Sequence, residues 1–205
     1  MTAIDAEGAG PAPRYKPASR FSITGFGFYV YLLSDAILFS ALFATYAVLH
    51  GAVAGGPPSS EVFSLTTVAL ETGCLLTSSF ICGLGMQAAE HRSKIGVLAM
   101  LVAVFALGAT FLGLEITEFG RMVHDGAGPD RSAFLSSFFA LVGAHGAHIT
   151  VGLIWIVVLL AHLLKMDLSE SFQRRLFCFS LFWHVLDIVW IAIFTFVYLL
   201  GVQGA

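Results

Sequence analysis

The sequence predicts an all-α membrane protein, a bundle of five transmembrane helices. The chain is 58% hydrophobic and only 11% charged, whereas a soluble globular domain is about 45–50% apolar and about 25% charged. Its apolar residues also gather in five runs that are long enough, at about 1.5 Å per helical residue, to cross a hydrocarbon core of about 30 Å. Because lipid offers no partner for open backbone groups, these runs are expected to be helices.

The five expected spans follow one another through short polar links. They cover residues 26–49, 62–89, 95–119, 132–164 and 176–200. Gly and Pro, which mark turns, punctuate the first and third links. The fourth run is longer than a bilayer needs, so it is expected to tilt or to project. Residues 1–22 are expected to form a mobile cytoplasmic tail, and residues 23–205 a single transmembrane domain.

The distribution of Lys and Arg predicts the orientation of the bundle. Eight of the ten basic residues fall in the tail and in the second and fourth links: Arg14, Lys16, Arg20, Arg92, Lys94, Lys165, Arg174 and Arg175. The opposite side carries only Arg121 and Arg131. Because the positive side of a membrane protein stays cytoplasmic, the N-terminus is expected inside and the C-terminus in the periplasm.

Charge and cysteine content exclude several classes of function. A formal net charge of -3 is too small to indicate nucleic acid or another strongly charged partner. Cys74, Cys82 and Cys178 lie inside apolar runs without C-x-x-C spacing, so they predict neither a redox motif nor a zinc site. They are interpreted as small, polarisable packing residues.

Four of the five acidic residues inside the expected spans lie in the first three spans, where an ionised carboxylate is costly and has to face protein or a cavity. Asp35 and Glu71 fall at comparable depths, and each is either a proton-exchanging group or a hydrogen-bonded acid that fixes helix packing. Glu115 and Glu118 share one helix face near the outer end of the third span. They are interpreted as partners of the outer arginines, because the Glu-x-x-His companions of di-iron bundles do not accompany them.

His145 and His148 share a face of the fourth helix and could both ligate one metal or haem. The residues around them are small and typical of close helix contacts: Gly143, Gly146, Ala147 and Gly152. A crowded contact leaves little room for a macrocycle. The two histidines are therefore expected to hydrogen-bond across the contact.

His184 and Asp187 are spaced three apart on the fifth helix, and Thr195 and Tyr198 fall on the same side of an ideal α-helix. A carboxylate beside a histidine can orient a metal ligand. The preferred interpretation is a buried pair whose two members satisfy each other. No nucleophile triad, phosphate loop or complete metal constellation is recognised along the chain.

Four stretches, in this order, resemble subunit III of the haem–copper respiratory oxidases. They are residues 28–46 with Asp35, the stretch Gly113-Leu114-Glu115-Ile116-Thr117-Glu118-Phe119, residues 138–148 with His145 and His148, and Trp183-His184-x-x-Asp187-x-x-Trp190. The run Gly-Pro-Asp-Arg-Ser at residues 128–132 resembles in particular the ubiquinol-oxidising members. Together these stretches cover nearly all of the chain after residue 20.

This resemblance implies a cofactor-free accessory subunit in a bacterial inner membrane. It implies the five-helix form of the family, which packs against subunit I, where haem and copper reduce oxygen to water and protons are pumped. Subunit II, a small subunit IV and membrane lipids are the other implied partners, and ubiquinol is the substrate of the complex. The implied role is to support assembly and lasting turnover and to bind phospholipid between the helices.

The resemblance also bears on single acids. Asp35 stands where the long form of the family has a reactive intramembrane Glu, and Glu118 matches a Glu of the family's corresponding span. Glu115 stands where some members have Gln. Because an acid in lipid has to be neutral or paired, Asp35→Asn is expected to leave initial oxidase activity close to normal and to shorten the working life of the enzyme or weaken its assembly.

Two other hypotheses come from different classes of protein. A small haem- or metal-bearing redox protein would use His145, His148 and His184 as ligands. An independent transporter would use Asp35, Glu71 and Asp187 as a proton relay, although no internal repeat of the kind common in transporters is visible.

Overall fold

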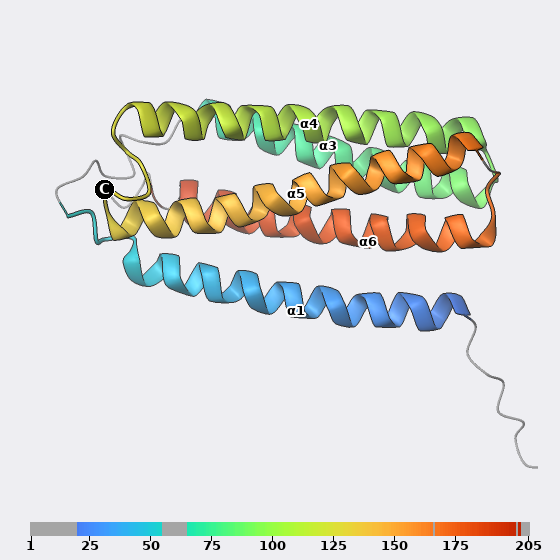
Figure 1. Ribbon diagram of the computed structural model, residues 1–205, viewed down its shortest axis with the longest axis horizontal. Coiled ribbons are helices and arrows are strands. Elements are labelled where there is room, and N and C mark those ends of the chain that lie inside the picture. Colours follow the sequence, from blue (N-terminus) through green and yellow to red (C-terminus); the bar gives the residue numbers. More distant parts are fainter. Residues whose placement is uncertain (1–19, 55–64, 166, 200, 202–205) are drawn as a thin grey trace, which may run out of the picture.

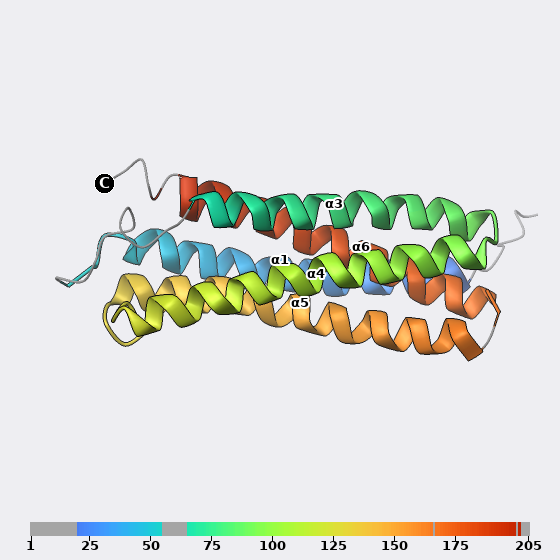
Figure 2. The ribbon, with the colours of Figure 1, turned by 90° about the horizontal axis from the view of Figure 1, so that it is seen from above.

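Five long helices make up the part of the chain that the computed structural model describes, residues 20–54, 65–165, 167–199 and 201. The elements are α1 (Arg20–Leu49), α3 (Leu65–Glu90), α4 (Lys94–His124), α5 (Ala133–Lys165), α6 (Glu170–Ile193) and the π-helical turn η1 (Phe194–Leu199). All five predicted spans are confirmed as helices long and apolar enough to cross a membrane. They run along one common axis, and successive helices point in opposite directions (Figures 1 and 2).

The helices extend beyond several predicted borders. α6 begins at Glu170 instead of residue 176, because the Ser169 side chain accepts a hydrogen bond from the Phe172 amide and caps the first turn. α4 continues to His124, and its last turn carries basic side chains that suit the negative end of the helix dipole. Hydropathy does not mark such polar ends. Residues 1–19 of the predicted tail and the start of the predicted second span lie outside the described residues.

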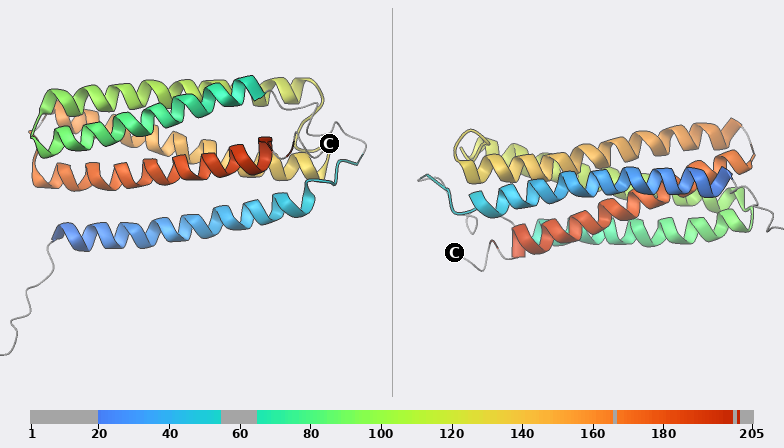
Figure 3. Two further views of the ribbon diagram at one scale, coloured as in Figure 1. Left: turned by 180° about the vertical axis from the view of Figure 1, so that it is seen from behind. Right: turned by 90° about the horizontal axis from the view of Figure 1, so that it is seen from below.

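α1 lies beside α5 and α6, away from the hairpin of α3 and α4 (Figures 1 and 3). Its buried side chains, Leu32, Phe39 and Tyr46, recur every seven residues. The partly buried Phe28 lies four residues before Leu32 and the partly buried Asp35 three residues after it, which is the heptad pattern of two helices packed along a narrow seam. The rest of α1 is largely exposed. We call this line of residues the α1 seam.

The other four helices pack around Trp183 of α6, which is 1% exposed. A Cβ atom added at Gly108 of α4 would lie 2.8 Å from Cη2 of its ring, and one at Gly152 of α5 would lie 2.8 Å from Cζ3. The indole therefore fills a notch formed by two glycines. The predicted close approach occurs at Gly152 and not at Gly146, where an added Cβ would meet Leu112 at an ordinary 3.8 Å.

Contacts between links tie the bundle together at each end. At one end, Lys94 pairs with Asp167 over 3.3 Å, which joins the α3–α4 link to the α5–α6 link. At the other end, the Phe134 amide donates to the Ala52 carbonyl over 3.3 Å, which joins the chain after α1 to the start of α5.

Candidate functional site: polar groups inside the helix bundle

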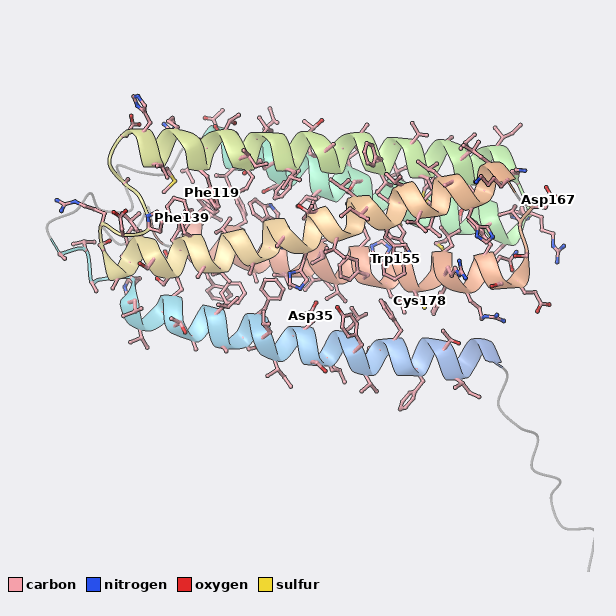
Figure 4. All side chains as sticks on the ribbon, in the orientation of Figure 1. Asp35, Phe119, Phe139, Trp155, Asp167 and Cys178 are labelled. Atoms are coloured by element: carbon pink, nitrogen blue, oxygen red, sulfur yellow. The ribbon has the colours of Figure 1, made fainter. Side chains whose placement is uncertain are left out.

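Asp35 and His148 meet where α1 packs against α5. Asp35 Oδ1 lies 3.2 Å from His148 Nε2, and the two side chains are 12% and 22% exposed. Figure 4 places Asp35 on the side of α1 that faces α5 and α6. His148 thus hydrogen-bonds across a helix contact, as its small neighbours suggested. The pair occupies one polar position within the otherwise apolar α1 seam.

The second ring nitrogen of His148 determines where the protons of this pair lie. Nδ1 is 2.7 Å from the Ala144 carbonyl, which can only accept, so Nδ1 donates. Nε2 is then the ring atom that faces the carboxyl group of Asp35 and hydrogen-bonds with it. A polar side chain that is paired in this way suits a position between helices in lipid.

His145 lies one turn away and is fully buried in a ring of aromatic side chains. Its ring centroid is 5.2 Å from that of Trp190, 5.7 Å from that of Phe111 and 6.4 Å from that of Phe39. Neither ring nitrogen has a hydrogen-bond partner among the described residues. The expectation of hydrogen bonds across the helix contact therefore describes His148 and does not describe His145. His145 is held by packing between α1, α4 and α6.

A ladder of polar contacts between α3 and α6 was missed by the sequence reasoning. Its rungs are Thr72 with Trp190, Ser78 with Trp183 and Cys82 with Ser180. The two indole N–H groups donate to hydroxyl oxygens over 3.0 and 2.9 Å, and the thiol lies 3.7 Å from its hydroxyl partner. The two sets run in opposite directions, with steps of six and four residues on α3 and of seven and three residues on α6. Hydroxyl residues on one helix and tryptophans on another are the sequence feature from which these contacts could have been predicted.

His184 and Asp187 are linked through a third residue and do not form the expected pair within one helix. His184 Nδ1 lies 2.7 Å from Ser79 Oγ of α3, and Asp187 lies beside both Ser79 and His184. The predicted polar stripe also ends early, because the π-helical turn η1 changes the helical phase after Ile193. Tyr198 is consequently buried in the bundle.

Three carboxyl groups of the α3–α4 hairpin lie within electrostatic range of one another. Glu71 and Glu115 are 1% and 3% exposed, and Oε1 of each has no hydrogen-bond partner among the described residues. Glu118 lies one turn beyond Glu115 and pairs with Arg121. The predicted pairing with an outer arginine thus describes Glu118 and not Glu115. We call Glu71, Glu115 and Glu118 the acid cluster.

The alternative sites do not assemble in the described part of the chain. No three His, Cys, Asp or Glu side chains there are grouped so that they could hold a metal ion. His145 and His148 both pack against Phe39, whereas His184 contacts Ser79. Asp35 contacts His148, Glu71 lies in the acid cluster, and Asp187 lies beside Ser79 and His184. The contacts that the described residues make therefore join helices to one another.

Comparison with known proteins extends the resemblance over the whole bundle. The family model for cytochrome c oxidase subunit III matches residues 19–202, which include all five helices. This range also contains the α1 seam, the α3–α6 ladder and the acid cluster. The match therefore concerns the complete arrangement described above and not a single motif.

Curated relatives are similar over most of their length. Cytochrome bo(3) ubiquinol oxidase subunit 3 of Pseudomonas aeruginosa is 51% identical over 178 residues, covering 87% of this chain and 85% of the relative. The protein of that name from Pseudomonas putida is 50% identical over 180 residues, or 88% and 87% of the two chains. Quinol oxidase subunit 3 of Bacillus subtilis is 44% identical over 178 residues, or 87% of each chain. The chain belongs to the cytochrome c oxidase subunit III family.

Proposed function

We propose that this chain is the accessory third subunit of a proton-pumping ubiquinol oxidase, which couples ubiquinol oxidation to the reduction of oxygen to water. The observation that carries the proposal is the identity of 51% and 50% to two proteins named as ubiquinol oxidase subunits, over most of both chains. Family membership alone would leave cytochrome c as an equal candidate for the electron donor.

The polar contacts inside the bundle support an accessory role. The Asp35–His148 pair joins α1 to α5, and the Trp190–Thr72 bond joins α6 to α3. Side chains used in this way stabilise one arrangement of helices. In the proposed complex the haem and copper belong to subunit I, and this chain supports the assembly and the lasting turnover of that subunit.

The proposed partners are subunit I, subunit II and a small subunit IV, together with membrane phospholipid. α1 offers the largest apolar surface for such contacts, since Phe26, Ile37 and Val48 are 71%, 72% and 81% exposed. In a membrane these side chains face lipid or a neighbouring subunit. They do not require burial within this chain.

We place the N-terminus in the cytoplasm and the C-terminus in the periplasm of a bacterial inner membrane. The start of α1, the α3–α4 link and the α5–α6 link lie at one end of the bundle (Figure 1). This end carries Arg92, Lys94, Lys165, Arg174 and Arg175. Basic residues gathered at one end support a cytoplasmic location for it.

Purification through a tag on the N-terminal tail, in mild detergent, tests the proposal. Larger haem-bearing subunits are expected to co-purify, and mass spectrometry identifies them. After dissociation the visible absorption bands are expected to stay with those subunits. Bands that travel with this chain alone, or a colourless chain without partners, would overturn the accessory role.

The electron donor is tested on the same preparation. Oxygen consumption is measured with a soluble ubiquinol and, separately, with reduced cytochrome c. The proposal expects turnover with the quinol and none with cytochrome c. The reverse result would keep the family assignment and reject the ubiquinol oxidase.

A further inference from the structure

The acid cluster contains two carboxyl oxygens whose surroundings do not satisfy them. Oε1 of Glu71 and Oε1 of Glu115 are buried and have no partner among the described residues. Buried polar atoms in native proteins are almost always hydrogen-bonded to protein or to an internal water molecule. An unpaired carboxyl oxygen surrounded by helices in lipid is especially costly.

The neighbours of the two acids include other acids and phenols. Glu115 lies within electrostatic range of Glu71 and Glu118, and Tyr198 of η1 lies within range of all three acids and of Tyr46. Arg121 is paired with Glu118 one turn nearer the end of α4. Ionised carboxylates at both Glu71 and Glu115 would therefore repel each other in an apolar interior.

The backbone brings a further polar group to the same place. Tyr198 lies in the π-helical turn at Phe194–Leu199 and is 1% exposed. π-Helical turns within α-helices are frequent at functional sites. Here the side chain that the turn places near the acid cluster is the phenol of Tyr198 and not an apolar side chain.

We propose that Glu71 and Glu115 form a binding site for an internal water molecule and hold one exchangeable proton together with it. The water donates to the two Oε1 atoms, and the shared proton removes one of the two negative charges. Glu118, next to Arg121 near the end of α4, provides a polar step between this site and the surface. The inference depends on the membrane bundle alone and not on the identity of the electron donor.

Infrared difference spectroscopy on the full complex, before and after transfer to heavy water, tests this inference. Spectra of the wild type are compared with those of Glu71→Gln and Glu115→Gln, which keep the side-chain volume. Glu90→Gln is the matched control, since Glu90 is exposed at the end of α3. One protonated-carboxyl C=O band that shifts in heavy water is expected in the wild type. Each of the first two variants should lose that same band, and the control should keep it.

The pattern of lost bands decides the result. If the wild type has no such band, or if neither variant loses it, the site is overturned. Two separate bands, each removed by its own variant, would overturn the sharing of a proton. Haem content and yield verify that the variants are assembled before their spectra are compared.

A second measurement does not depend on any variant. An experimental density map of the wild-type complex is expected to contain an ordered water within about 2.5–3.0 Å of both carboxyl groups. Carboxyl groups in direct contact without a water, or a metal ion between them, would overturn the inference. Because the partner subunits are identified separately, failure here leaves the proposed function intact.

Discussion

Asp35 Oδ1 of α1 lies 3.2 Å from His148 Nε2 of α5, and this contact occupies a position of the α1 seam that would otherwise be apolar. A single polar position in a heptad seam fixes the register and the partner of a helix. A shift of α1 by one helical turn would carry the carboxyl group about 5.4 Å away from His148. The pair therefore favours one placement of α1 on the rest of the bundle.

Asp35→Asn is expected to leave the initial oxidase activity close to normal and to shorten the working life of the enzyme. The Asn amide can still donate to His148 Nε2, whereas Asp35→Leu removes the partner and should weaken the attachment of α1 by about 0.6–1.7 kcal/mol. The loss of oxygen consumption during sustained turnover measures the effect. Ser34→Ala is the control, because Ser34 bonds only its own helix at Val30. Immediate and complete loss of oxygen reduction in an intact complex would contradict the prediction.

Gly152→Ala is expected to destabilise the bundle by about 1–3 kcal/mol, because the added methyl group would overlap the ring of Trp183. Gly108 of α4 approaches the adjacent ring atom Cη2, so the same edge of the ring is packed tightly by two helices. Gly113→Ala is the matched control, since an added Cβ there meets no atom within 4 Å. The thermal midpoint in detergent compares the two variants, and equal midpoints would show that Trp183 does not limit the approach of α5.

Thr72→Val is expected to cost about 0.6–1.7 kcal/mol, because it removes the acceptor of the buried Trp190 indole without changing the volume of the side chain. Thr110→Val makes the same chemical change at an exposed position of α4, where the hydroxyl bonds only the Ala106 carbonyl. Denaturant-induced unfolding in mixed micelles measures both. A larger effect at Thr110 than at Thr72 would refute a stabilising role for the α3–α6 ladder.

Asp167→Asn is expected to change stability by less than about 0.5 kcal/mol, although it breaks the ion pair between the two links at that end of the bundle. Lys94 and Asp167 are 45% and 98% exposed, and such exposed pairs contribute little because water and salt screen them. The thermal midpoint at low and at high salt checks this. A large loss at low salt alone would mean that the pair belongs to a wider charge network.

Local spacing located the polar residues but did not identify their partners. Glu115 and Glu118 were expected to behave alike, since they share a helix face, yet Glu118 pairs with Arg121 while Glu115 is buried within electrostatic range of Glu71. One helical turn along the axis separates the half-exposed Arg121 and its partner from the buried interior. The i, i+3 rule describes a face and carries no information about this depth.

The pairing of His184 with Asp187 was expected for the same reason, and Ser79 of α3 replaced it. The i, i+3 rule considers one helix alone, so it cannot predict a hydrogen bond to a hydroxyl group of a neighbouring helix. The change of phase at η1 was equally hidden, because a π-helical turn has no clear composition signal. These differences arise where a second element supplies a contact or where the helical period is not 3.6.

The sequence by itself determined the membrane class, the five spans and the family of this protein, because lipid as a solvent demands long apolar helices and because the motifs lie within them. Only the tertiary structure decided which helices touch, that Asp35 meets His148, that Trp183 packs against Gly108 and Gly152, and that Glu71 and Glu115 are buried within electrostatic range of each other. Hydropathy is a property of each segment alone. Contacts between segments depend on close packing in three dimensions, where the position of a single methyl group or proton decides which side chains can meet.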